Sequence, residues 1–226
     1  MARNEMTYSQ QQTAPTISRR AYNALTYGLV TISFLVLWGT YLFAEGGGLE
    51  RMLTGAGGIA LLIGFVIATI GGTILMTVGK KKQSVGLTFA GYALFSLTFG
   101  VTLSLILQRY DVGTITYAFG ITACVSGIFL IAGVVFPQFF SRIGGVLVIG
   151  LAAVILVEIV ATVFFHASQT IFDYIVIALF CGFLGYDSYL MANDQPTVPN
   201  ALFHASNIYL DIINILIRVL DILDND

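Results

Sequence analysis

Six apolar stretches, each long enough to cross a lipid bilayer, constrain what this chain can fold into. A membrane-spanning helix needs roughly 20 predominantly apolar residues. Stretches of that length occur at 22–43, 55–78, 85–107, 113–136, 143–165 and 170–191. Since no water is present in the bilayer core, the backbone polar groups must be paired within the protein, and a helix does this within one segment. The pattern therefore predicts an all-α integral membrane protein.

The composition supports one membrane domain over residues 21–226. Hydrophobic residues make up 57% of the chain and charged residues 10%, and the sequence has a mean hydropathy of +0.89, whereas a soluble domain is about 25% charged. Residues 1–20 are polar and rich in Gln, Thr and Ser, which predicts a flexible cytoplasmic tail. No basic patch indicates nucleic acid as a partner. We expect the lipid bilayer as the surroundings and no cofactor.

A seventh segment, residues 201–223, is apolar but interrupted by polar residues. On a helical wheel with Asp211 as the reference, a set of polar side chains falls within roughly 80° of it. The set is His204, Asn207, Asn214, Arg218 and Asp221. A polar stripe along an apolar helix predicts a seventh transmembrane helix enclosed by the other six. The alternative is an amphipathic helix that lies on the membrane surface.

The Lys and Arg residues predict the orientation. If the spans alternate from the first one, seven basic residues lie on one side and two on the other. The first group is Arg3, Arg19, Arg20, Lys80, Lys81, Lys82 and Arg142, and the second is Arg51 and Arg109. Because cytoplasmic loops carry the excess of Lys and Arg, we expect a cytoplasmic N-terminus in a multi-pass protein of a cell membrane.

Two aspartates lie within hydrophobic segments near the end of the chain. Asp187 lies close to the end of the sixth segment, and Asp211 lies in the middle of the seventh. A carboxylate at the bilayer centre costs roughly 2.5–3.5 kcal/mol on insertion scales, so such residues usually mark a function. The predicted orientation places both in the cytoplasmic half. Two carboxyl groups within hydrogen-bonding distance cannot easily both ionise, so we expect the pair to titrate as one unit.

The sequence around these aspartates resembles a known family. The blocks 185-GYDSYL-190 and 209-YLDIINILIRVL-220 are similar to the late motifs of the Bax inhibitor-1 family, also called transmembrane Bax inhibitor motif proteins. That family has a Tyr-Asp pair at the end of the sixth helix and a YLDIIN-like stretch in the seventh. Here they are Tyr186-Asp187 and residues 209–214. The topology over residues 20–223 is similar as well, and the chain length favours a bacterial member.

The resemblance implies a seven-helix protein whose polar seventh helix is surrounded by the other six. Bacterial and organellar members are associated with a pH-sensitive calcium leak, and eukaryotic members with suppression of cell death. It also implies that Asp187 and Asp211 are a proton-sharing pH sensor and that a basic residue at the end of the second helix, here Lys80, latches one aspartate. This chain departs from many members at Ser188, where they have Thr followed by Gln.

These observations lead to a hypothesis for the function. The singly ionised pair holds segments six and seven together and anchors Lys80, and full protonation releases the constriction. Calcium prefers oxygen ligands, so Asp187 and Asp211 are candidates for transient calcium binding. The candidate residues of the ion path are His204, Asn207, Asn214, Arg218 and Glu158. Calcium and protons are thus the expected ligands, and no enzymatic activity is expected.

Two alternatives belong to other classes of protein. Intramembrane aspartyl proteases also use two aspartates, but a Gly-x-Gly pattern precedes their second one, whereas Ile208-Tyr209-Leu210 precedes Asp211 here. A non-conducting regulator would bind other membrane proteins, such as a membrane protease or an apoptosis factor, with the polar tail as its contact.

Two further carboxylates lie in the apolar segments. Glu158, near the middle of the fifth segment, is either an ion-path carboxylate or a protonated glutamate bonded to a neighbour. Asp173, three residues into the sixth segment, is expected to interact with the positive N-terminus of that helix near the outer surface.

Overall fold

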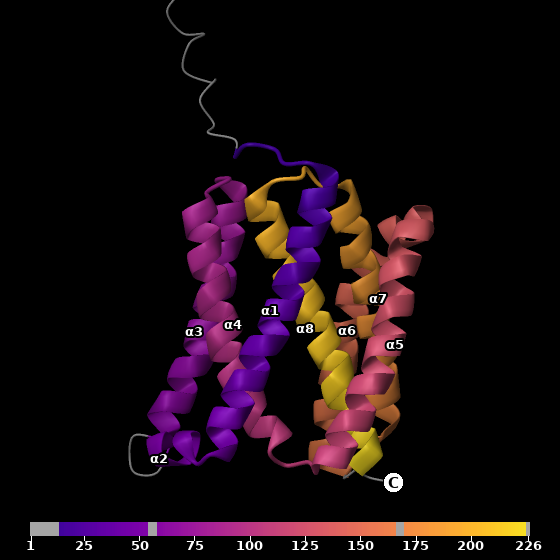
Figure 1. Ribbon diagram of the computed structural model, residues 1–226. Helices are drawn as coiled ribbons and strands as arrows, with labels where there is room; N and C mark the ends of the chain where they lie inside the picture. Colours follow the sequence, from indigo (N-terminus) through magenta and orange to yellow (C-terminus); the bar gives the residue numbers. More distant parts are fainter. Residues whose placement is uncertain (1–13, 54–57, 166–169, 225–226) are drawn as a thin grey trace, which may run out of the picture. The chain divides into compact units, whose positions relative to one another are not determined.

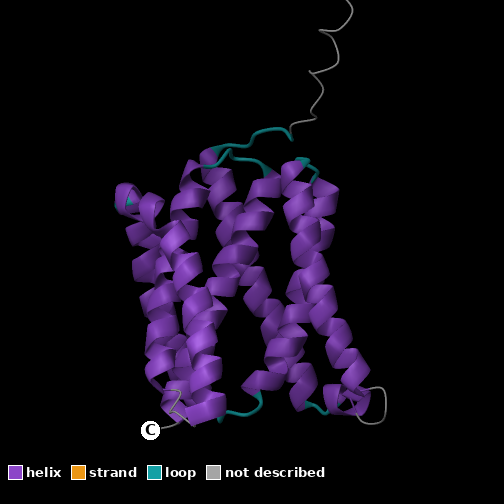
Figure 2. Ribbon diagram, turned by 180° about the vertical axis from the view of Figure 1, so that it is seen from behind, coloured by secondary structure: helices purple, strands orange, loops and turns teal. Residues whose placement is uncertain are grey.

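The computed structural model describes residues 14–53, 58–165 and 170–224, and within them it is all-α. Figure 2 shows helices joined by short loops. The eight helices of the described residues are α1 Arg19–Glu45, α2 Gly48–Leu53, α3 Gly58–Lys81, α4 Val85–Leu107, α5 Val112–Val135, α6 Pro137–Phe165, α7 Thr170–Asn193 and α8 Val198–Asp224 (Figure 1).

Six of these helices are long and apolar enough to cross a membrane, which confirms the six predicted spans. They are α1, α3, α4, α5, α6 and α7. The seventh predicted segment is also a helix, α8, but it does not reach the same apolar character within the residues that the structure describes. Its enclosure by the other six helices stays a prediction.

The helix limits differ from the predicted ones at two places. α6 begins at Pro137 and not at 143, because proline fits the first position of a helix, where its missing N–H has no partner to lose. The short helix α2 occupies residues 48–53, which were predicted as a connection. Gly47 precedes it with a φ of +73°, a left-handed conformation that glycine adopts at little cost.

The chain forms two compact units. The first contains Met1–Ser104 and Gln195–Ser206, and the second contains Leu105–Asp194 and Asn207–Asp226. Helices α1 to α4 therefore belong to the first unit, apart from the last turn of α4, and α5 to α7 belong to the second. The first turns of helix α8 belong to the first unit, and the remainder, including Asp211, belongs to the second.

In the first unit, α3 and α4 approach each other through small residues. A Cβ added at Gly91 would lie 2.6 Å from the backbone nitrogen of Met76, and one at Gly79 would lie 2.6 Å from that of Thr88. Glycine at such positions lets membrane helices pack backbone to backbone. Tyr92 of α4 reaches α1, where its hydroxyl donates to the carbonyl oxygen of Leu29 at 2.6 Å.

The start of α8 is fixed to the turn between α3 and α4. Gln83, in that turn, has a φ of 50° and donates from Nε2 to Asn200 Oδ1 at 3.0 Å. It also accepts from the hydroxyl of Thr197 at 2.9 Å. Thr197 Oγ1 in turn accepts from the backbone N–H of Asn200, which satisfies a donor that a helix start leaves unpaired.

The segment before α1 contacts the same region. Thr16 forms an isolated antiparallel bridge with Thr197, and the Ile17 N–H donates to the Pro196 carbonyl at 2.8 Å. Helix α1 then begins at Arg19, after Ser18 accepts from the Ala21 N–H. Of the predicted tail, residues 1–13 lie outside the described residues.

In the second unit, α7 packs against both α5 and α6. A Cβ added at Gly133 of α5 would lie 2.1 Å from the carbonyl oxygen of Gly185 in α7, and one at Gly185 would meet the ring of Phe140. Tyr186, the next residue, lies with its ring against Gly144 of α6. These close approaches surround the chain immediately before Asp187.

Candidate site: a buried carboxyl pair

Asp187 and Asp211 come together within the second unit. Asp187 lies on α7 and is 9% exposed, and Asp211 lies on α8 and is 4% exposed. Their carboxyl groups hydrogen-bond to each other. Because one carboxyl group must donate a proton to the other, the hydrogen-bonded pair carries at most one negative charge. The arrangement can therefore hold, gain or lose a proton as a unit.

The surroundings of Asp211 are mostly apolar. Its neighbours on α8 include Ile208, Ile212 and Ile215, all of them buried. Oδ2 of Asp211 is buried without a hydrogen-bond partner among the described residues. Few buried polar atoms in proteins lack a partner, so this oxygen distinguishes the site from an ordinary buried carboxyl group.

Asp187 is held by the packing of its neighbours in α7. The hydroxyl of Ser188 donates to the carbonyl oxygen of Leu130 in α5 at 2.7 Å. Together with the close approach of Gly133 and Gly185, this bond fixes α7 to α5 on both sides of Asp187.

Lys80, the candidate latch, lies in the last turn of α3. Its Nζ atom is 3.5 Å from Nε2 of His204 and 4.4 Å from the ring centroid of Phe203, a geometry suited to a cation–π interaction. Lys80 and His204 belong to the first unit, and the aspartates belong to the second. A contact between Lys80 and an aspartate stays a prediction.

Two asparagines of the candidate ion path, Asn207 and Asn214, lie half-buried on α8. The amide of Asn214 donates to the carbonyl of Leu210 in its own helix at 2.8 Å, which uses one of its two N–H donors. Within the described part of the chain, no cluster of three or more His, Cys, Asp or Glu side chains is placed to hold a metal ion. The candidate calcium ligands are therefore the two carboxyl groups of Asp187 and Asp211.

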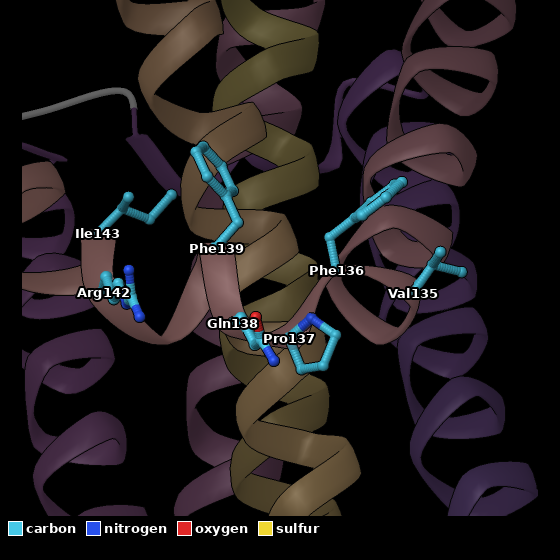
Figure 3. Close-up of a pocket in the computed structure, with 7 residues that line it drawn as sticks. All are labelled: Val135, Phe136, Pro137, Gln138, Phe139, Arg142 and Ile143. Atoms are coloured by element: carbon cyan, nitrogen blue, oxygen red, sulfur yellow. The ribbon is translucent and has the colours of Figure 1, made fainter.

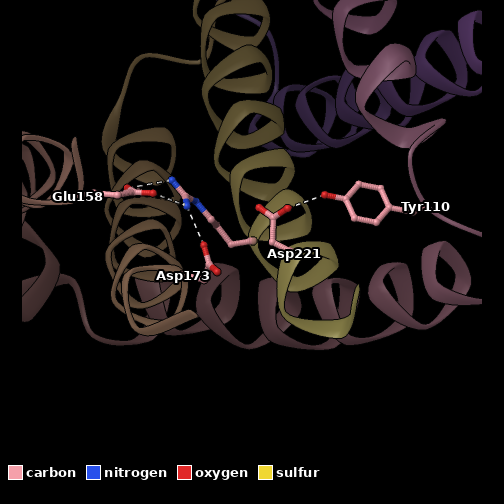
Figure 4. Close-up of polar contacts among 5 residues, drawn as sticks. Tyr110, Glu158, Asp173 and Asp221 are labelled. Atoms are coloured by element: carbon pink, nitrogen blue, oxygen red, sulfur yellow. Dashed lines mark hydrogen bonds and ion pairs between the residues drawn. The ribbon is translucent and has the colours of Figure 1, made fainter. Parts of the chain in front are cut away.

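A second polar cluster lies in the same unit and is centred on Arg218. Its Nη1 atom is 2.9 Å from Oε1 of Glu158 in α6 and 2.7 Å from Oδ1 of Asp173 in α7. One turn further along α8, Asp221 accepts from the hydroxyl of Tyr110 at 2.5 Å. Figure 4 shows both sets of contacts. The cluster therefore joins α6, α7 and α8.

The cluster bears on the interpretation of two residues. Asp173 lies in the first turn of α7, as predicted, where a carboxylate suits the positive end of the helix. It is only 1% exposed and also bonds to Arg218, so it is more buried than its expected place near the outer surface implies. Glu158 bonds to a neighbour, as one of its two predicted roles states, and that neighbour is the cation Arg218. The sequence contained a signal for this cluster: Glu158 lies seven residues before the end of α6 and Asp173 three residues after the start of α7, so both lie toward the adjoining ends of two consecutive helices.

Two groups in the turn between α4 and α5 have shifted pKa values. Burial, followed by the hydrogen bond and charge of Asp221, raises the pKa of Tyr110, so its hydroxyl stays a donor at neutral pH. The Thr114 hydroxyl and N–H lower the pKa of the exposed Asp111 carboxyl. Asp111 precedes α5 and accepts from the N–H of Gly113 at 2.8 Å, which makes it the cap of that helix.

Fold and site together define a multi-pass α-helical membrane protein with a buried pair of carboxyl groups. The sequence profile described as "Inhibitor of apoptosis-promoting Bax1" matches residues 14–226. The chain therefore belongs to the Bax inhibitor-1 family, which confirms the resemblance seen in its last two motifs.

Bacterial relatives support the assignment. The chain is 27% identical over 227 residues to the inner membrane protein YbhL of Escherichia coli K12, covering 93% of this chain and 94% of the relative. An uncharacterised protein of Deinococcus radiodurans is 26% identical over 235 residues, covering 96% and 95%. Another from Borreliella burgdorferi is 31% identical over 153 residues, covering 62% and 64%. No solved structure matches the chain.

Proposed function

We propose that this protein is a pH-sensitive calcium leak channel of a bacterial inner membrane, with a cytoplasmic N-terminus and with Asp187 and Asp211 as its proton sensor. One observation carries the proposal: two buried carboxyl groups on α7 and α8 share a hydrogen bond. Structural stability alone does not favour such a pair, because apolar side chains of similar size would be less costly to bury.

The sensor works through the charge of the pair. With one proton shared, a carboxyl group donates to a carboxylate, and such charge-assisted bonds are stronger than neutral ones. A second proton leaves only a neutral bond between α7 and α8. Acidification therefore weakens the connection between Asp187 and Asp211, and the leak increases as the pH falls.

The path that opens is lined by the polar face of α8, which we propose is enclosed by the six spanning helices. Asn207 and Asn214 offer carbonyl oxygens along this face, and Asp211 Oδ2 offers a buried oxygen without a partner among the described residues. Oxygen ligands suit calcium. In this proposal His204, Arg218 and Glu158 lie along the same route, and the carboxyl pair has a conducting and not a catalytic role.

The test is calcium flux from liposomes that contain the purified protein, measured between pH 6 and 8. The wild type is expected to leak faster at pH 6. Asp211→Asn and Asp187→Asn are expected to leak at a rate that no longer depends on pH. Asp224→Asn, which changes an exposed carboxylate on the same helix as Asp211, is the matched control and should keep the wild-type profile.

Two results would overturn the proposal. A pH profile of Asp211→Asn parallel to that of the wild type would exclude the pair as the sensor. The absence of flux from protein that is folded and correctly inserted would exclude the channel. In that second case, a captured membrane-protein partner would favour the regulator, and cleavage of a transmembrane peptide would favour the protease.

A further inference from the structure

A groove lies at the turn where α5 ends and α6 begins, and its lining includes neither Asp187 nor Asp211. It has a volume of about 720 Å³, which is within the range of small-molecule sites. Figure 3 shows the residues that line it: Val135, Phe136, Pro137, Gln138, Phe139, Arg142 and Ile143. All belong to the second unit.

The groove combines exposed apolar side chains with one positive charge. Phe136 and Phe139 are 60% and 59% exposed, a degree of exposure that is typical of lipid-facing or partner-binding surfaces. Arg142 is also exposed. No hydrogen bond or ion pair of Arg142 occurs among the described residues, and the lining includes no carboxylate. In Figure 3 the side chains of Arg142 and Gln138 lie below the rings of Phe136 and Phe139.

The position of the groove suits the boundary between lipid and water. It joins the end of one spanning helix to the start of the next, and Arg142 is one of the basic residues that predict the cytoplasmic side. Bacterial and other cytoplasmic leaflets carry anionic lipids, and basic pockets at this level bind their headgroups. An arginine also matches the geometry of a phosphate group with two parallel hydrogen bonds.

We propose that this groove binds one anionic phospholipid. Arg142 holds the phosphate, the Gln138 amide donates to the headgroup, and the upper part of an acyl chain lies along Phe136, Phe139 and Ile143. A zwitterionic lipid is disfavoured because its headgroup has no net negative charge to complement Arg142. A free phosphate ion is disfavoured because it would leave the apolar lining without a partner.

The proposal can be tested by lipid binding to the full-length protein in detergent, followed by native mass spectrometry. Phosphatidylglycerol and phosphatidylcholine with the same acyl chains are titrated separately. The wild type is expected to bind phosphatidylglycerol roughly fivefold more tightly, as one arginine at a membrane surface implies. Arg142→Ala should abolish this preference. Lys81→Ala, which removes an exposed cation of the same predicted side outside the groove, should keep it.

Three results would overturn the proposal. Equal binding of the two lipids to the wild type would exclude charge recognition, and an unchanged preference in Arg142→Ala would exclude this groove. Displacement of the lipid by millimolar inorganic phosphate would indicate a phosphate site and not a lipid site. If Arg142→Ala does not fold, Arg142→Gln serves the same purpose with a side chain of closer size. None of these readouts depends on calcium flux.

Discussion

Gly133 of α5 faces Gly185 of α7 so closely that a Cβ atom at Gly133 would lie 2.1 Å from the Gly185 carbonyl oxygen. No side chain fits between the two backbones at this point. The Ser188 hydroxyl makes its bond to Leu130 less than one turn of each helix away. The two contacts hold the backbone of α7 against α5 on both sides of Asp187.

Gly133→Ala is expected to destabilise the protein by about 1–3 kcal/mol, the usual cost of overpacking. The added methyl group forces α5 and α7 apart next to Asp187. The matched control is Gly127→Ala on the same helix, where a Cβ would meet nothing within 4 Å. Thermal unfolding of both variants in detergent measures the difference. Equal unfolding temperatures would show that α5 and α7 do not pack through these glycines.

Arg218→Met is expected to destabilise the protein by on the order of 3 kcal/mol, because it leaves the buried Asp173 and the half-buried Glu158 without their cation. Replacement of the two carboxylates in the same chain, as Glu158→Gln and Asp173→Asn, should recover much of this loss. Denaturation of the single, double and triple variants measures the coupling. Strictly additive effects would contradict a shared cluster.

The N-terminal cap of α5, Asp111, makes a contribution to stability that depends on pH. The pKa of the Asp111 carboxyl group is lowered in the folded state. The stabilisation by this cap is therefore complete above the unfolded pKa near 3.8 and is lost as the pH falls through the folded pKa. Asp111→Asn keeps a capping side chain but does not titrate. The advantage of the wild type over this variant in thermal unfolding should therefore shrink between pH 6 and pH 3. An advantage that grows on acidification would contradict the lowered pKa.

The Lys80→Ala variant tests whether Lys80 is a latch or an ordinary surface lysine. If it restrains the closed state, Lys80→Ala should raise calcium leak at pH 8 by about fivefold, which corresponds to an interaction of about 1 kcal/mol. Lys81→Ala is the control, because Lys81 is exposed, whereas Lys80 is half-buried beside Phe203. Equal leak from the two variants would assign the latch to another residue.

The spans could be predicted from the sequence because hydropathy records contact with lipid directly. Hydropathy is a weaker signal for the part of a helix that extends beyond the lipid. For this reason the first turn of α6, with Gln138, Ser141 and Arg142, was predicted as a connection although it is helical. The same limit applies to α2, whose glycines and charges indicate a loop while its backbone forms a short helix.

Pairing between helices was predictable only where two residues were unusual for the same reason. Asp187 and Asp211 were both costly carboxylates of the predicted cytoplasmic half, so a pair could be expected. Asp173 had an adequate local explanation at the start of its own helix, and its bond to Arg218 depends on the rotation of α7 and α8. One sequence does not specify that rotation.

The bridge between Thr16 and Thr197 connects two segments that lie far apart in the sequence. It attaches the residues before α1 to those that start α8. A substitution at Thr16 or Thr197 therefore alters the segment before α1 and the start of α8 together.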